Sequence, residues 1–194
     1  MIASTINAAL LPLRLVPKDE PAASLAADLD RLPDGHAIPI FGHIQLVETI
    51  AALAARRTIA YLSATTWAFS PEAVFTLSKS ISDGHLLAGE IWIGTNRSTQ
   101  TSEALEAAFT ILTSRLKICQ TPNHAKIFAI DFADGSTPLA ITGCCNLHSI
   151  PRLGPTLTVA IRGAPARDAL KAAFARLTPL IKAEDRTDAL QLDL

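Results

Sequence analysis

The residue types best suited to chemistry lie close together in the second half of the chain. His124 and Lys126 stand two positions apart at the start of a predicted strand, so their side chains project from the same face. An imidazole can act as a nucleophile, and an ammonium group beside it can hold the charge of an anionic phosphoryl group. This pair therefore predicts a phosphate site. The alternative interpretation is a strand-edge histidine beside a solvated lysine.

A second polar segment follows one predicted hairpin later, at Gly143, Cys144, Cys145 and Asn146. A glycine lets the backbone approach a ligand closely, and an asparagine amide can donate a hydrogen bond to a phosphate oxygen. This segment ends the strand that pairs with the one beginning at Lys126, so it strengthens the prediction of a phosphate site. The two cysteines are interpreted as small buried residues rather than reactive thiols. They are expected to be reduced, because neighbouring cysteines form a disulfide only with a distorted backbone.

Strands and helices must position these residues, and the periodicity of apolar residues predicts most of them. Strands are predicted at residues 58–63, 90–94, 116–119, 126–131, 138–142 and 157–161, with a hairpin turn at 133–136. Helices are predicted at 22–32 and 44–57, and from Ser70, Ser102 and Pro165 onward, the last continuing to Ile181. This order predicts an α/β fold with a mixed, mostly parallel sheet flanked by helices.

The chain divides by composition into three segments. Residues 1–40 contain five prolines and are predicted to form an N-terminal extension, residues 41–182 a single domain, and residues 183–194 a polar tail. No internal repeat or low-complexity segment is found in the sequence.

The spacing of these motifs resembles the phospholipase D superfamily, in its single-motif, nuclease-like branch. His124, Lys126 and Asp131 supply the H-x-K-x4-D (HKD) pattern, and Gly143, Asn146 and Leu147 supply the motif that follows one hairpin later. The resemblance covers roughly residues 40–182, with the motif evidence in the second half. It implies a phospholipase D-like single domain.

The resemblance also implies a mechanism that needs no metal and no cofactor. By analogy, His124 attacks phosphorus to give a phosphohistidine, and Lys126 and Asn146 hold the non-bridging oxygens. Asp131 is implied as a supporting residue of the catalytic set. Gly143, Cys144 and Arg152 are further candidates for contact with the substrate phosphate. The implied activity is that of a phosphodiesterase, a nuclease-like hydrolase.

A second histidine is needed in this mechanism to protonate the leaving group and then to activate water. The remaining histidines are His36, His43, His85 and His148, and none of them is followed by lysine two positions later. One motif in the chain therefore predicts a two-fold homodimer whose site lies on the dimer axis. DNA or RNA is the expected partner, by analogy with the nuclease-like branch.

Two departures from the family pattern support an alternative function. Cys144 stands where relatives have a serine, and Gly154 stands where relatives often have a glutamate that orients the histidine. Without that acid the imidazole is less well fixed in tautomer and orientation. The alternative is a catalytically degenerate phospholipase D-like module that binds nucleic acid or a protein partner without turnover.

Other interpretations of the same residues remain open. His124, Cys144, Cys145 and His148 could ligate zinc, but their spacing is not that of a zinc motif, and no metal site is predicted. Trp67 and Trp92 are interpreted as core or dimer-interface anchors rather than as platforms for stacking bases. If the motif is accidental, the chain is an interaction protein unrelated to phosphate chemistry.

Composition limits the classes of protein to which the chain can belong. The chain has 194 residues, of which 49% are apolar, and a net charge of −1 from 17 basic and 18 acidic side chains. These values exclude a disordered chain and argue against binding nucleic acid through bulk positive charge, but not against a local cationic pocket. Neither a membrane span nor a secretory signal is predicted. Three cysteines without a disulfide framework indicate a cytoplasmic protein.

Overall fold

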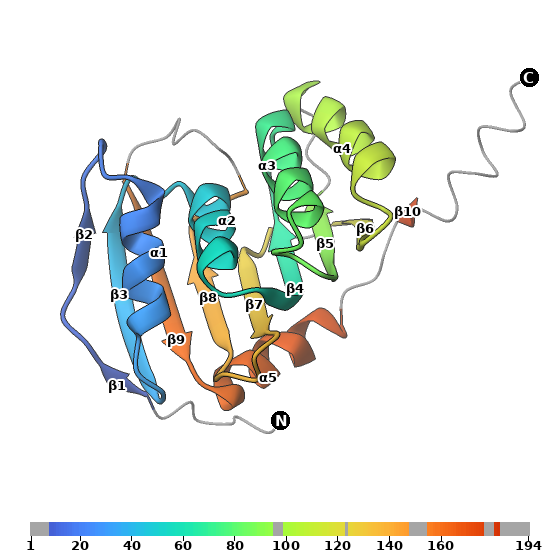
Figure 1. Cartoon of the computed structure of the whole chain (residues 1–194). Helices are drawn as coiled ribbons and strands as arrows, with labels where there is room; N and C mark the ends of the chain where they lie inside the picture. The colour runs from blue at the N-terminus through green and yellow to red at the C-terminus, as the bar shows by residue number, and fades with distance from the viewer. Residues whose placement is uncertain (1–7, 95–98, 123, 148–154, 177–180, 183–194) are drawn as a thin grey trace, which may run out of the picture.

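A computed structural model of the chain describes residues 8–94, 99–122, 124–147, 155–176 and 181–182. It contains one central sheet with the strand order β1-β3-β9-β8-β7-β4-β5-β6-β10, and β2 also pairs with β3 (Figure 1). The strands are β1 (Ala9–Leu10), β2 (Arg14–Val16), β3 (His36–Gly42), β4 (Ile59–Thr66), β5 (Gly89–Gly94), β6 (Leu116–Thr121), β7 (Ile127–Phe132), β8 (Leu139–Gly143), β9 (Thr156–Arg162) and β10 (Ile181–Lys182).

The sheet is mixed, and most of its strands run in the direction of β4. The neighbours β4, β5 and β6 are parallel to one another. Strands β7 and β9 run in the opposite direction, and so does β10 at the far edge. The carboxyl ends of β4, β5 and β6 therefore meet at one edge of the sheet, beside the start of β7.

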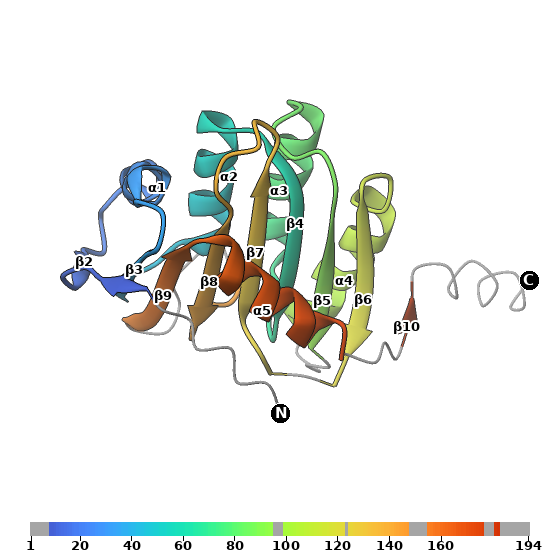
Figure 2. The ribbon, with the colours of Figure 1, turned by 90° about the horizontal axis from the view of Figure 1, so that it is seen from below.

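Within the described residues, five helices cover the two faces of the sheet: α1 (Ala22–Arg31), α2 (Leu46–Arg56), α3 (Pro71–Ser82), α4 (Thr99–Ile111) and α5 (Ala164–Phe174). Neighbouring helices from α1 to α4 contact one another, and α5 contacts β7 and β8. Figure 2 shows α5 crossing one face of the sheet, with α2 and α3 on the opposite face. The chain is thus a three-layer α/β structure.

Successive side chains along the central strands point to opposite faces of the sheet, so the core is divided between the two faces. The large hydrophobic cluster includes Leu62 on β4 and Phe128 and Ile130 on β7, together with residues of α1 to α4. A small second cluster contains Trp92 on β5, Cys119 on β6 and Phe174 on α5. Both faces of the sheet are therefore buried over part of their area, as a covered α/β sheet requires.

The predicted fold class is confirmed, and most of the predicted elements are present. The hairpin turn is found where Gly135 has φ +73° between the antiparallel strands β7 and β8. Helix α3 begins at Pro71, and the Ser70 side chain accepts a hydrogen bond from the Ala73 backbone N–H at 3.3 Å. This serine is the predicted helix cap.

Two features of the fold differ from the sequence prediction. Strands β1, β2 and β3 were not predicted, and β3 crosses the predicted boundary at residue 40 to join the N-terminal segment to the central sheet. Ile181 belongs to β10, which pairs antiparallel with β6, and not to the last helix, which ends at Phe174. Among the described residues, no helix has the length and apolar character needed to cross a membrane.

Candidate functional site

His124 and Lys126 lie immediately before β7, at the edge of the sheet where β4 ends. Ile127, the first residue of β7, pairs with Thr65 near the end of β4. The Thr65 hydroxyl donates a hydrogen bond to the Ala125 carbonyl oxygen at 2.8 Å and so ties the two segments together. Open α/β sheets commonly bind ligands at the carboxyl ends of their strands. The fold therefore places the predicted pair at a favourable edge.

The two side chains of the pair contact each other directly. Lys126 Nζ lies 2.9 Å from His124 Nδ1 and 3.2 Å from the His124 carbonyl oxygen. His124 is exposed, whereas only 9% of Lys126 is accessible to solvent. Burial lowers the pKa of Lys126, although the nearby Cys144 and Cys145 thiols act in the opposite direction. A partly desolvated cation thus lies directly beside an accessible imidazole.

The contact with Lys126 determines which nitrogen of His124 carries a proton. An ammonium group donates and has no lone pair with which to accept, so Nδ1 of His124 must be the acceptor. In the neutral imidazole the proton is then on Nε2. Nucleophilic attack through Nε2 requires that this proton move.

Trp67 forms one side of the site, and the sequence analysis did not predict this role. Its ring centroid lies 4.6 Å from that of His124, at an interplanar angle of 38°. Trp67 follows the last residue of β4 and is only partly buried, so it is not a core anchor. Its position directly after a central parallel strand and before the Ser70 helix cap is the signal that could have identified it.

Asn146 is held against the same segment of chain that carries Trp67. Its Oδ1 accepts a hydrogen bond from the Ala68 backbone N–H at 3.2 Å and lies 3.5 Å from the Thr66 hydroxyl. The Thr66 hydroxyl also accepts a hydrogen bond from the Leu147 backbone N–H at 3.0 Å. This arrangement orients the amide through its oxygen, so its Nδ2 hydrogens are the group suited to an anionic ligand.

The Gly143–Cys144 turn fits closely against β9. Gly143 has φ +154°, and a Cβ on it would lie 2.5 Å from the Leu157 carbonyl oxygen. The Gly143 N–H donates to the Lys126 carbonyl at 3.4 Å, and the Cys144 N–H donates to the Leu157 carbonyl at 2.9 Å. Because these N–H groups bond to neighbouring strands, the exposed Cys144 side chain is the part of this turn that remains to face a ligand.

Cys145 is buried, as the sequence interpretation expected, whereas Cys144 is exposed and departs from that interpretation. Its buried Sγ lies 3.0 Å from the Thr156 hydroxyl and 2.9 Å from the Thr158 hydroxyl. Burial raises the pKa of this thiol, although the two hydroxyl contacts oppose the shift. These contacts anchor the second motif to β9.

Asp131 is not brought to this site. It lies five residues beyond Lys126, an odd number, so its side chain points to the opposite face of the sheet, toward α5. Its carboxylate accepts hydrogen bonds from Arg167, at 2.6 Å, and from Lys171. Burial acts to raise the pKa of Asp131, but the bonds from Lys171 and Arg167 outweigh it and lower that pKa. The geometry gives Asp131 a structural position between β7 and α5.

Some of the candidate residues cannot be placed. Arg152, His148 and Gly154 lie outside the described residues. Within the described ranges, no cluster of three or more histidine, cysteine, aspartate or glutamate side chains is arranged to hold a metal ion.

Comparison with known proteins bears on the fold. No family model matches the chain, and no curated protein matches it. The structure is similar to Nuc, a phospholipase D family member from Salmonella typhimurium, at 12% identity and a TM-score of 0.51, over 79% of this chain and 95% of that one. It is also similar to a phosphatidylserine synthase from Haemophilus influenzae, at 14% identity and a TM-score of 0.52 over 77% of this chain.

The two similarities differ in their extent. The chain spans nearly all of Nuc, but its match covers only 40% of the synthase. Identities this low bear on the architecture and not on the activity. The order of strands and helices, the layers and these two similarities together identify a phospholipase D family fold.

Proposed function

We propose that the chain is a phospholipase D-like phosphodiesterase, a nuclease-like hydrolase that works through a phosphohistidine intermediate on His124. The observation that supports this most directly is the contact between an accessible imidazole and a buried ammonium group, His124 Nδ1 to Lys126 Nζ at 2.9 Å. Asn146 is held by the same end of β4 and presents amide hydrogens. These three groups are the ones needed to bind and attack an anionic phosphodiester.

Substrate binding and activation of His124 are coupled in this proposal. A phosphate oxygen attracts the Lys126 ammonium, which then releases Nδ1 of His124. Nδ1 can accept a proton as Nε2 loses one, so the Nε2 lone pair becomes free to attack phosphorus. The P–O bond to the leaving group breaks as the N–P bond forms, and an acid supplies the proton to the departing oxygen. Water then cleaves the N–P bond and restores the imidazole.

The acid in this proposal is His124 of a second copy of the chain. One H-x-K motif per chain supplies one nucleophile, and the mechanism needs two imidazoles on opposite sides of phosphorus. A two-fold homodimer with its axis at the site provides both of them. The exposure of His124 is compatible with such a shared site.

Nucleic acid is the proposed substrate class, and DNA and RNA are both included. Trp67 is a partly exposed aromatic side chain beside His124, and an aromatic ring next to a phosphate site suits a stacked base. None of Cys119, Cys144 and Cys145 forms a disulfide, which agrees with the proposed cytoplasmic location.

The test is cleavage of single- and double-stranded DNA and RNA by the purified chain in the presence of EDTA. We expect cleavage that is lost in His124→Ala and retained in Asp168→Asn, a matched charge-neutral variant of an exposed residue on α5. Equal cleavage by His124→Ala and the unchanged chain would overturn the proposal.

A second candidate is a module that binds phosphodiesters without turning them over. The observation that favours it is the partner of His124 Nδ1, which is the Lys126 ammonium and not a carboxylate. A carboxylate would hold the proton on Nδ1 and keep Nε2 ready for attack. Hydrolysis of bis(p-nitrophenyl) phosphate that disappears in Lys126→Ala rejects this candidate, whereas saturable binding with no hydrolysis supports it.

A further inference from the structure

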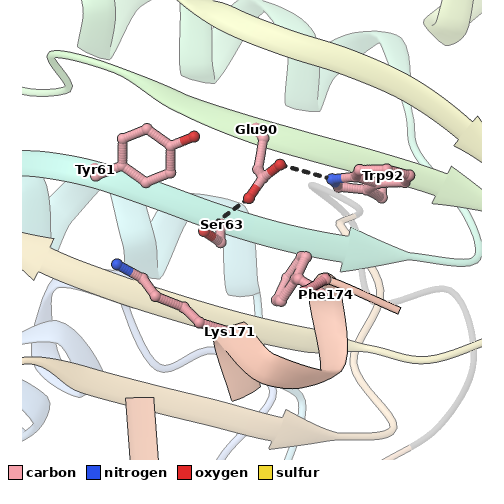
Figure 3. A pocket seen from close by; sticks show the side chains of 7 residues that line it. Tyr61, Ser63, Glu90, Trp92, Lys171 and Phe174 are labelled. Carbon is pink, nitrogen blue, oxygen red and sulfur yellow. Dashed lines mark hydrogen bonds between the residues drawn. The ribbon is translucent and has the colours of Figure 1, made fainter. Parts of the chain in front are cut away.

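A groove on the α5 face of the sheet is lined by residues that are separate from the phosphate site. It has a volume of about 320 Å³ and is lined by Tyr61, Ser63, Glu90, Trp92, Lys171, Phe174 and Ala175. These residues come from β4, from β5 and from the carboxyl-terminal end of α5 with its cap residue Ala175 (Figure 3). None of them belongs to the His124 site, so an inference about the groove stands independently of the proposed function.

Glu90 is the central polar group of the groove. One of its carboxylate oxygens accepts a hydrogen bond from the Ser63 hydroxyl at 3.3 Å, and the other accepts one from Trp92 Nε1 at 2.9 Å. Both donors are neutral, so they orient the carboxylate without cancelling its charge. Each oxygen has a second lone pair, and Glu90 forms no ion pair with any residue in the described part of the chain.

Aromatic rings surround this carboxylate. Figure 3 shows Tyr61 and Trp92 on either side of Glu90, with Phe174 across the groove. Trp92 is 6% exposed and Phe174 is 5% exposed, so these walls are well packed, whereas Tyr61 is 36% exposed. A carboxylate within aromatic walls attracts cations both through its charge and through the ring faces.

The chain's own lysines show that these ring faces attract ammonium groups. Lys171 Nζ lies 5.7 Å from the centroid of the Tyr61 ring, and Lys117 Nζ lies 5.7 Å from the centroid of the Trp92 ring. Lys171 shares the Asp131 carboxylate with Arg167, which also pairs with Asp168, so the charges of these four side chains balance one another. Lys117 is exposed and lies opposite Glu90 in the pairing of β5 with β6, so it is the internal cation that would compete with a ligand.

We propose that this groove binds an organic cation, a guanidinium or a primary ammonium group, with Glu90 as its counter-ion. The cation takes the free lone pairs of Glu90 and lies against the rings of Tyr61 and Trp92. Negative charge in the groove is also felt by Tyr61: burial raises the pKa of its hydroxyl, and Glu90 raises it further. An anionic or neutral ligand would not use these features.

The experiment uses the indole N–H signals of ¹⁵N-labelled protein, because the chain has two tryptophans, one in each site. The probes are N-acetyl-arginine amide, N-acetyl-lysine amide and N-acetyl-citrulline amide, the last being a neutral analogue of the arginine side chain. We expect the Trp92 signal to shift saturably with the arginine or the lysine probe, and to respond at least tenfold more weakly to citrulline. The Trp67 signal should stay unchanged.

Two substitutions define the roles of the charges. Glu90→Gln should weaken binding of the cationic probe at least tenfold, and glutamine can still accept from Trp92 while it donates to Ser63. Lys117→Met removes the internal competitor and should strengthen binding severalfold. Asp168→Asn removes one negative charge from α5 outside the groove and should change little.

Three results would overturn the proposal. They are equal responses to arginine and citrulline, no response in either the unchanged chain or Lys117→Met, and weaker binding in Lys117→Met. If Glu90→Gln fails to fold, as judged by loss of the dispersed Trp92 signal, the direction of the Lys117→Met effect decides. A negative result for cation binding would not affect the proposal of cleavage at the His124 site. A negative result for cleavage would likewise not affect the proposal for the groove.

Discussion

At the scale of single residues, the pairing of Lys126 with His124 is the feature on which the chemistry depends. Lys126 is almost fully buried, and its ammonium is held against the imidazole and the His124 carbonyl. A desolvated cation binds an anion more strongly than a solvated one, because little water must be displaced and the local dielectric is low. The lysine therefore has two roles in the proposal, to hold phosphate and to control the imidazole proton.

Removing this ammonium should reduce turnover strongly. Lys126→Ala is expected to lower kcat/KM for bis(p-nitrophenyl) phosphate by about 100-fold, the usual effect of losing one group that stabilises developing charge. The loss should appear in kcat as well as in KM, as measured by initial rates. A loss confined to KM would show that Lys126 contributes only to uniform binding of the substrate.

The pH dependence of binding should reflect the burial of Lys126. Burial lowers its pKa, and only the protonated form attracts an anion. Affinity for dimethyl phosphate, followed by the Trp67 indole signal, should therefore decline on the alkaline side at a lower pH than an exposed lysine would give. Lys126→Arg should remove this decline, because arginine stays protonated. A decline that persists unchanged in Lys126→Arg would assign it to another group.

Asp131 should affect stability and not the chemical step. Hydrogen bonds from Lys171 and Arg167 lower its pKa in the folded chain, so its contribution is present above the pKa of the unfolded state, about 3.9, and is lost as the pH falls through the folded value. Asp131→Asn is expected to reduce the free energy of unfolding at pH 7 by about 1–3 kcal/mol. The difference from the unchanged chain, measured by urea titration, should shrink below pH 4.

The matched control for Asp131 is Asp168→Asn on the same helix. Asp168 also contacts Arg167, but its side chain is 61% exposed, so its ion pair is well screened by water. Its removal should change the free energy of unfolding by less than about 0.5 kcal/mol. A kcat that falls in Asp131→Asn with stability unchanged would contradict the structural assignment.

At the scale of elements, the hairpin of β7 and β8 and residues 144–147 after it bring the two motifs together. Gly143 is the tightest point, because its positive φ and the close approach of Leu157 leave no room for a side chain. Gly143→Ala is expected to cost about 2 kcal/mol or more in the free energy of unfolding and to displace the following segment. Thermal and urea unfolding measure the first effect, and the Trp67 signal reports the second.

Gly135 provides the comparison for Gly143. It also has a positive φ, +73°, but a Cβ there would meet no atom within 4 Å. Gly135→Ala should therefore cost only the conformational term, about 1–2 kcal/mol, and leave phosphate binding unchanged. Equal effects of the two substitutions on binding would show that the fit at Gly143 does not matter to the site.

Helices and strands could be predicted from sequence wherever the apolar periodicity agreed with the residues typical of helix caps and turns. The Ser70-Pro71 start of α3 and the polar turn at 133–136 combine both kinds of information. Strand β3 was missed because Pro39 interrupts its pattern, and prolines are rare in central strands. In the structure Pro39 lies between the part of β3 that pairs with β1 and the part that pairs with β2, where the missing N–H is tolerated.

The same reasoning explains the other differences. The sequence itself argues against a helix that continues to Ile181, because proline at position 179 is incompatible with a helix interior, and the prediction from apolar spacing neglected it. In the site, the proximity of the His124 and Lys126 side chains could be predicted, because positions two residues apart on an extended segment share a face. The contacts of Trp67 and Thr66 could not be predicted, because they depend on which strands become neighbours in the sheet.

At the scale of the whole molecule, the net charge of −1 and the single H-x-K motif set the requirements for activity. Bulk charge does not attract nucleic acid, so the proposed function requires a local cationic pocket, and its second imidazole requires a second copy of the chain. Mixed dimers of the unchanged chain and His124→Ala should then be inactive, since each shared site needs both imidazoles. Activity of randomly mixed dimers should fall with the square of the unchanged fraction. A linear fall would show that each chain works alone.

The most direct measurement is a search for the covalent intermediate by rapid alkaline quench and peptide mass spectrometry during turnover of a phosphodiester. The proposal predicts a phosphoryl adduct on the imidazole of His124, formed in the unchanged chain and in Asp168→Asn, and absent in His124→Ala. Continued hydrolysis by His124→Ala, with no adduct on His124 in the unchanged chain, would contradict it.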